Sequence, residues 1–410
     1  MQNNTVEVKV TLKEKTDGSN IDLSHLIKRA NGHSQNELVR LIEERQEELI
    51  LEFCGPKYSR SHPYKRGGSY TKTLVTGIGV IRFKVKRVIR RIDGRTSSPI
   101  LDALDVRCQK YSRDVRMKLA EFASKMSYND SRLEFETATG VHVPKRTIHS
   151  FVKEIAPMLL EANKTTDEPG IVLGDSTEVR ALGSKEMNNV HILLSDGGQL
   201  LHLGVNSEWP NVKADALVSD NEPGLINAVK AERRQLGILH ALKYLLFTLW
   251  GEKMRKDERI EVDKAAKQAL FTLVNSTKKH RRDKDKKRLK KRIDKTLREL
   301  HEIADELENR GYIKASSFIN RNARFMVTFA QLTLEDVEIP YTTNKIERLM
   351  GEISKRCKHK WMHWSTEGLR NILTIVLIRY TDEKLYNQFK NAYIHNRPFT
   401  KTGTAQKANT

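Results

Sequence analysis

A short apolar run that ends in an acid, IVLGDST at residues 171–177, decides the fold that this chain is predicted to adopt. The pattern returns in ALVSDNEP at 216–223, so that Asp175 and Asp220 each follow a short apolar strand. Between them, apolar residues at 190–194 and 200–205 flank an Asp-Gly-Gly turn, which predicts a β-hairpin. Because acids at the carboxyl ends of strands face the ligand crevice of an α/β sheet, we expect Asp175 and Asp220 to line a site.

A third acid, Glu347, lies in YTTNKIER at residues 341–348, at the start of a predicted helix. Three carboxylates that converge from two strands and a helix form an all-oxygen site suited to Mg²⁺ or Mn²⁺. Two such ions, roughly 4 Å apart, activate an attacking oxygen and stabilise a leaving oxygen in phosphodiester chemistry. A structural alternative stays open for each acid, since aspartate after a strand is also a common turn residue or helix cap, and Asp220 fits that role.

Three neighbouring acids compete with this set. Glu178 is the alternative acid on the first strand. Asp196 lies in the Gly-Gly hairpin turn and is interpreted as structural. Glu352 follows Glu347 by five residues, about 140° around a helix, so the two cannot share a face.

The N-terminal half combines an arm, a helix and a basic ribbon. Residues 1–33 are predicted to be a loosely ordered arm, after which Ser34 and Glu37 form a capping box for a helix that ends near residue 55. Residues 70–76 and 80–89 flank a Gly-Ile-Gly turn and predict a two-stranded ribbon. Its apolar face carries Ile81, Phe83 and Val85, and its other face carries Arg82, Lys84 and Lys86.

Residues 111–157 change to a helical pattern, with breaks at 127–129 and 139–143. Pro144 opens the last of these helices, where a first-position proline is tolerated. The order of helix, glycine-containing turn and helix resembles a helix-turn-helix DNA reader, although many helical hairpins share it. The side chains placed to read DNA would be Lys145, Arg146, Thr147 and His149.

The charge of the chain favours a polyanionic partner. Its 410 residues carry 73 Lys and Arg against 52 Asp and Glu, hence 73 − 52 = +21, and nucleic acid is the commonest intracellular polyanion. Basic residues cluster at 84–91, 278–292 and 355–360, which suits several contacts along a polymer; the alternative is a merely solvated surface. Besides the ribbon and the helix-turn-helix residues, the candidate DNA contacts are Arg87, Lys355, Arg356, Lys358 and Lys360.

Several classes of protein are disfavoured by the composition. No long uncharged apolar run predicts a membrane span, and the N-terminal residues lack the basic-then-apolar order of a signal peptide. Cys54, Cys108 and Cys357 lie too far apart for a disulfide framework or a four-cysteine zinc site. We therefore expect a cytoplasmic, nucleoid-associated protein with no membrane partner.

The region between the sheet and Glu347 is predicted to be helical. No proline occurs between Pro223 and Pro340, and the composition is rich in Leu, Lys, Arg and Glu. The charged run at 278–292 is expected to be an exposed helix or loop that holds backbone phosphates or is simply solvated. A further apolar helix is expected at 369–380, and the tail at 400–410 is predicted to be disordered.

The order of these elements resembles the DDE transposases, which have an RNase H-like catalytic core, and in particular the Mutator-type and related insertion-sequence transposases of prokaryotes. The resemblance covers roughly residues 65–390 and includes TNKIE at 343–347 and WSTEGLRNIL at 364–373. It implies an α+β multidomain protein whose RNase H-like mixed α/β core is interrupted by a helical insertion and preceded by the basic ribbon and a helix-turn-helix region. The implied segments are 1–55 (arm and helix), 56–110 (ribbon), 111–165 (helix-turn-helix), 168–240 (core), 241–320 (insertion), 321–395 (core) and 396–410 (tail).

Carried over by position, the resemblance implies that Asp175, Asp220 and Glu347 are catalytic and bind two Mg²⁺ or Mn²⁺ ions. It makes His240 and Asn344 possible auxiliary residues of the active site, although the family's acid or cysteine three residues before the histidine is Gly237 here. A satisfied structural histidine is the alternative for His240. A base-stacking role or simple core packing is open for Trp361 and Trp364.

The implied activity is that of a transposase. It would bind terminal inverted repeats of double-stranded DNA, cut at the element's ends and join the freed 3′-hydroxyl to target DNA, acting as a homodimer or higher oligomer. Two other functions remain open: a catalytically inactive, transposase-derived DNA-binding protein, and an RNase H-like nuclease that only hydrolyses.

Overall fold

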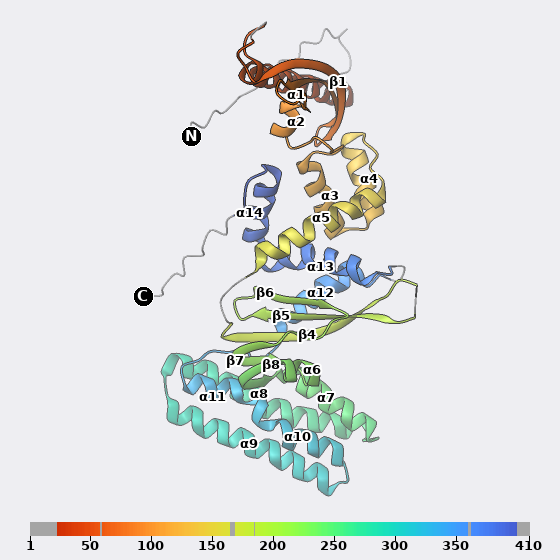
Figure 1. Cartoon of the computed structure of the whole chain (residues 1–410). Helices are drawn as coiled ribbons and strands as arrows, with labels where there is room; N and C mark the ends of the chain where they lie inside the picture. The colour runs from red at the N-terminus through yellow and green to blue at the C-terminus, as the bar shows by residue number, and fades with distance from the viewer. Residues whose placement is uncertain (1–22, 58–59, 165–168, 184, 360–361, 400–410) are drawn as a thin grey trace. The chain divides into compact units, whose positions relative to one another are not determined.

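The computed structural model describes residues 23–57, 60–164, 169–183, 185–359 and 362–399 (Figure 1). Residues 1–22 of the predicted arm, the tail at 400–410, Lys360 and Trp361 lie outside these ranges. So do residues 165–168, half of the polar stretch at 163–170 whose composition is typical of a linker. The chain divides into two compact units, one formed by 1–155 with 388–410 and the other by 156–387.

The basic ribbon is present in the first unit and packs on a long helix. Strands β1 (Tyr64–Thr76) and β2 (Gly79–Arg90) pair in antiparallel register up to Thr76 and Gly79, and the short β3 (Thr96–Ser97) extends the sheet. Helix α1 (Leu23–Cys54) covers one face, where the Gln46 amide binds the backbone of Lys84 and Lys86. Ile81, Phe83 and Val85 are buried there, as the alternation predicts.

The predicted start of α1 is wrong. The helix begins at Leu23, eleven residues before Ser34, so that Ser34 lies inside it and donates its hydroxyl to the Ala30 carbonyl. A serine inside a helix satisfies its side chain in this way, and the capping-box spacing alone does not distinguish the two situations.

The predicted helical region at 111–157 contains α3 (Arg113–Lys125), α4 (Tyr128–Thr139) and α5 (Lys145–Asn163). A short helix that was not predicted, α2 (Pro99–Ala103), precedes them. Ser127 caps α4, and Gly140 ends it with φ of 68°, a conformation that favours glycine. Helix α5 runs through Pro157 to Asn163, further than the sequence pattern indicates.

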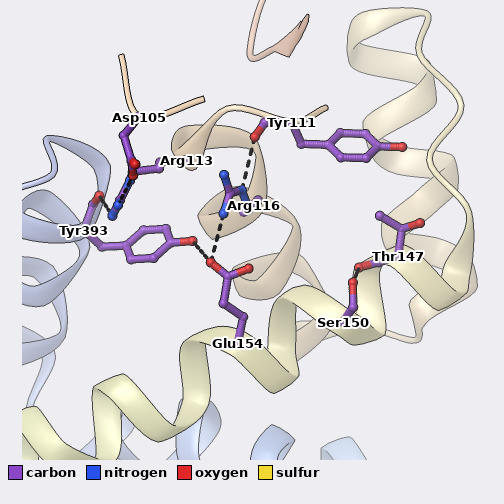
Figure 2. Close-up of polar contacts among 8 residues, drawn as sticks. All are labelled: Asp105, Tyr111, Arg113, Arg116, Thr147, Ser150, Glu154 and Tyr393. Atoms are coloured by element: carbon purple, nitrogen blue, oxygen red, sulfur yellow. Dashed lines mark hydrogen bonds and ion pairs between the residues drawn. The ribbon is translucent and has the colours of Figure 1, made fainter. Parts of the chain in front are cut away.

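The C-terminal helix α14 (Glu383–Ile394) is an element that the sequence reading did not predict. Figure 2 shows how its end is fixed in the first unit: the Tyr393 hydroxyl donates to Glu154 Oε1 over 2.8 Å, and the buried Arg116 guanidinium donates to the same oxygen over 2.9 Å. Arg113 adds a bond to the Tyr393 carbonyl and an ion pair with Asp105. Burial and the bond to Glu154 raise the pKa of Tyr393 well above its usual value.

The second unit contains a five-stranded mixed sheet in the order β6-β5-β4-β7-β8. Strands β5 (Met187–Ser195) and β6 (Leu200–Val205) form the predicted antiparallel hairpin, and β4 (Ile171–Arg180) pairs with β5, also antiparallel. Strand β7 (Val212–Ser219) lies parallel to β4. Two expectations are wrong here. Strand β4 continues five residues beyond Asp175, and the residues after the short helix α6 (Pro223–Ala228) form a strand, β8 (Val229–Leu236), parallel to β7.

Helices occupy the rest of the second unit. They are α7 (Ile238–Gly251), α8 (Lys256–Asp283), α9 (Lys286–Asn309), α10 (Ile313–Met326), α11 (Thr328–Leu334), α12 (Asn344–Cys357) and α13 (Thr366–Thr381). Helices α10 and α11 contact β8, whereas α12 contacts β4 and α13 contacts β6. The charged run at 278–292 forms the end of α8 and the start of α9, with His280 and Leu289 turned into the helical packing. No helix in the described ranges is both long and apolar enough to cross a membrane.

Candidate active site

Asp175 and Asp220 are brought side by side by the parallel pairing of β4 and β7. The last paired residues in this register are Gly174 and Ser219, and each aspartate comes directly after one of them. Asp175 itself is not at the end of a strand, since it remains paired with Ile192 of β5. The place where β7 ends therefore defines the site.

Burial and mutual repulsion disfavour the charged forms of these two aspartates. The pKa of Asp175 is raised to about 6, first by burial and then by the negative charge of Asp220. Burial also raises the pKa of Asp220, although His240 opposes this shift. Asp220 Oδ1 is buried without a hydrogen-bond partner, and the helix cap that follows is Glu222 rather than Asp220. Besides His240, the guanidinium of Arg234 lies within electrostatic reach of Asp220.

Glu347 is connected to the two aspartates by His240, which contacts Glu347 and acts electrostatically on both aspartates. It lies in the first turn of α12, where the Thr343 hydroxyl donates to Oε1 over 3.1 Å. His240, in the first turn of α7, places Nε2 2.7 Å from the same oxygen. Because His240 also lowers the pKa of Asp175 and Asp220, its ring lies within electrostatic reach of all three acids. Of the predicted auxiliary residues, Asn344 is exposed at the start of α12.

Glu222 is a fourth acid that the sequence interpretation missed. Its Oε2 accepts a hydrogen bond from the Ser176 hydroxyl over 2.9 Å, and its Oε1 accepts one from the Trp209 indole over 3.1 Å. Its charge contributes to the raised pKa values of Asp175 and Asp220. Its position two residues after Asp220 is the signal in the sequence, but the pattern there predicts only the start of a helix.

The donor set fits a divalent cation at the aspartate pair. Carboxylate oxygens are the preferred ligands of Mg²⁺ and Mn²⁺, and the unpartnered Oδ1 of Asp220 offers such an oxygen. Within the described ranges, no three His, Cys, Asp or Glu side chains are gathered closely enough to hold a metal ion. Glu347 is held by His240 in this arrangement, so completing a three-carboxylate site requires Glu347 to exchange this partner.

The competing acids lie elsewhere. Glu178 is exposed on β4, three residues after Asp175 and therefore on the opposite face of the strand. Asp196 lies in the hairpin turn and pairs with Lys345, and Glu352 pairs with Lys355 over 2.7 Å.

The candidate DNA contacts of the first unit are mostly exposed. On the ribbon, Arg82 and Lys84 are exposed, Arg87 lies over the Tyr70 ring, and Lys86 pairs with Glu47. At the start of α5, three side chains are exposed and Thr147 is half-buried; the exposed ones are Lys145, Arg146 and His149.

The basic cluster at 355–360 is more mixed. Lys355 is exposed, and Lys358 contacts the Thr177 hydroxyl. Arg356 is 4% exposed, with its guanidinium over the Trp364 ring, so it does not offer its charge at the surface. Trp364 is itself buried, which favours core packing over base stacking for this residue.

Comparison with models of protein families gave no match, and the curated proteins also contain none that matches this chain.

Proposed function

We propose that this protein is a DDE-type transposase, which cleaves DNA strands in a metal-dependent reaction and transfers the freed ends. The observation that carries the proposal is the register of β4 and β7, which sets Asp175 beside Asp220 while His240 links Glu347 to them. The sheet order β6-β5-β4-β7-β8 sets β4 and β7 side by side, which are the first and fourth strands of this sheet in chain order. An RNase H-like core requires this arrangement of the two strands that carry its acids.

The side chains divide the chemistry between them. Asp175, Asp220 and, after release from His240, Glu347 would hold Mg²⁺ or Mn²⁺, which when bound activates the attacking oxygen and stabilises the leaving oxygen. His240 holds Glu347 near the two aspartates until the cation binds. Glu222, fixed by Ser176 and Trp209, adds negative charge that strengthens the attraction for cations. Water attacks at the end of the element, and the resulting 3′-hydroxyl then attacks a target phosphodiester.

Recognition of DNA ends is assigned to the first unit. Carboxylates read no sequence, whereas the exposed residues of the ribbon and of the start of α5 offer cations and hydrogen-bond donors to duplex DNA. Cutting two ends in concert calls for a homodimer or a higher oligomer.

The test uses the full chain and linear DNA that carries the inverted repeats flanking its gene. Nicking at the repeat ends in Mg²⁺ or Mn²⁺, absent in EDTA and in Asp220→Asn, is the expected result. Asp196→Asn is the matched control, because it removes a turn carboxylate of the same unit outside the site. A pre-cut end with a free 3′-hydroxyl is expected to be joined to a target plasmid.

Two outcomes would redirect the assignment. Binding of end DNA without any cleavage would indicate an inactive, transposase-derived DNA-binding protein. Cleavage without joined product would indicate an RNase H-like nuclease that only hydrolyses.

A further inference from the structure

A groove opens directly beside the candidate carboxylates. A pocket of about 560 Å³ is lined by Asp220 and His240 as well as by Tyr244, Phe247 and Phe318. A second pocket of about 720 Å³ shares these three aromatic residues and extends to Phe325. Because the two pockets have walls in common, they form one continuous groove that reaches the acids.

Helix α7 gives the groove its direction. His240, Tyr244, Phe247 and Gly251 are spaced by four, three and four residues and so lie on one face of the helix. His240 contacts Glu347, and Phe247 lies about 10 Å further along the helix axis at 1.5 Å per residue. The groove therefore leads from the acids outward along α7.

The aromatic side chains of α7 are presented to solvent. Tyr244 is 51% exposed and Phe247 is 65% exposed, although both are large enough to dominate a core. The Tyr244 ring is supported from behind by the buried Phe318, with ring centroids 4.6 Å apart. A supported but uncovered aromatic surface of this kind indicates a binding site.

Cations line the same groove. Lys243, Lys314, Arg321 and Arg324 all contribute to its walls. Within the described part of the chain, none of the four forms an ion pair with a carboxylate. Aromatic rings flanked by cations that have no carboxylate partner can bind single-stranded nucleic acid, because bases stack on the rings while phosphates contact the cations.

We propose that this groove holds unpaired nucleotides of the DNA strand whose phosphodiester lies at the acids, with bases stacked on Tyr244 and Phe247. The proposal deepens the proposed function and rests on it for the identity of the strand. The base-stacking role considered for Trp364 thus passes to α7, because Trp364 is buried.

The experiment measures binding of fluorescein-labelled (dT)15 to the full chain by anisotropy, in EDTA, so that binding is separated from cleavage. Phe247→Ala and Tyr244→Ala are each expected to weaken binding by roughly five- to a hundredfold. Phe247→Tyr and Tyr244→Phe, which keep an aromatic ring, are expected to bind (dT)15 as tightly as the wild type. Tyr380→Ala is the matched control, since Tyr380 is 48% exposed on α13 outside the groove.

A second readout places the base. A (dT)15 strand with one 2-aminopurine is expected to lose fluorescence on binding the wild type and to keep it with Phe247→Ala. Unchanged affinity in both alanine variants would overturn the proposal even if the protein cleaves DNA. Loss of self-association in Phe247→Ala, with (dT)15 binding intact, would overturn it in favour of a protein interface. If the alanine variants bind (dT)15 more weakly but the wild type never cleaves DNA, the groove is a binding site for single-stranded DNA and the proposed transposase activity is wrong.

Discussion

His240 and Glu347, 107 positions apart in the chain, meet with Nε2 2.7 Å from Oε1. The contact joins the first turn of α7 to the first turn of α12. It fixes the third acid near the two aspartates while keeping one of its oxygens occupied. A residue that holds a ligand in this way is expected to matter for the reaction without touching the substrate.

Replacing His240 tests this positioning role. His240→Ala is expected to lower the rate of DNA cleavage by about 10- to 100-fold, because residues that orient metal ligands have effects of that size. His240→Gln, which keeps a hydrogen-bond donor, restores part of the rate. His301→Ala, an exposed histidine of α9, is the control. Full activity of His240→Ala in a folded protein would contradict the role.

The buried aspartates are expected to lower the stability of the folded protein without a cation and to raise it when a cation is bound. Asp220→Asn in EDTA is expected to raise the free energy of unfolding by about 1–3 kcal/mol, since it removes a buried charge that repels Asp175. Mg²⁺ or Mn²⁺ raises the melting temperature of the wild type because the ion binds only the folded state. The variant loses this response, while Asp196→Asn keeps it. An unchanged melting temperature of the wild type in saturating Mn²⁺ would argue against a cation at the pair.

Two glycines of the second unit predict opposite effects of alanine. A Cβ on Gly174 would lie 2.6 Å from a methyl carbon of the buried Leu225, so Gly174→Ala is expected to destabilise the protein by about 1–3 kcal/mol. Gly351, within α12, has open space around it, and Gly351→Ala stabilises by about 0.5–1 kcal/mol. Urea denaturation measures both. The proposed clash between the new Cβ and Leu225 is contradicted if Leu225→Ala lowers the free energy of unfolding as much in the Gly174→Ala background as in the wild type.

The ribbon predicts a salt-dependent contribution to duplex binding. Arg82→Ala and Lys84→Ala are each expected to weaken binding of any duplex and to reduce the slope of log affinity against log salt by about 1. Lys86→Ala has a smaller effect, because Lys86 already pairs with Glu47. Lys267→Ala, which removes a paired lysine of α8, is the control. Equal slopes for the wild type and all four variants would show that the ribbon is not part of the DNA-binding surface.

The cysteines predict selective reactivity. Cys108 is exposed, whereas Cys54 and Cys357 are buried. Burial raises the pKa of Cys54, and it raises that of Cys357 to about 12, so that neither forms thiolate readily at pH 8. Iodoacetamide at pH 8 is expected to label Cys108 alone in the native protein and all three after denaturation, as read by peptide mass spectrometry. Native labelling of Cys357 would show that α12 opens.

The sequence by itself determined the elements whose signal is local. Alternation of apolar and cationic residues defined the ribbon, and Ser127 and Gly140 marked the ends of α4. The apolar runs that precede Asp175 and Asp220 identified two strands of the mixed sheet. Each of these features depends on neighbours within a few residues, so the pattern is readable without the fold.

Only the tertiary structure decided the rest. Strand β8 reads VKAERRQL, a charged sequence that becomes a strand at the sheet edge because β7 offers its backbone as a parallel partner. The sequence marked Glu222 by its position and His240 by the resemblance, but not the bonds that fix Glu222 or the contact of His240 with Glu347. The helix start at Leu23 and the aromatic groove along α7 were not predicted. The groups that meet at the site come from segments far apart in the chain, and such meetings are set by how the sheet pairs and how the helices pack on it, which no local periodicity encodes.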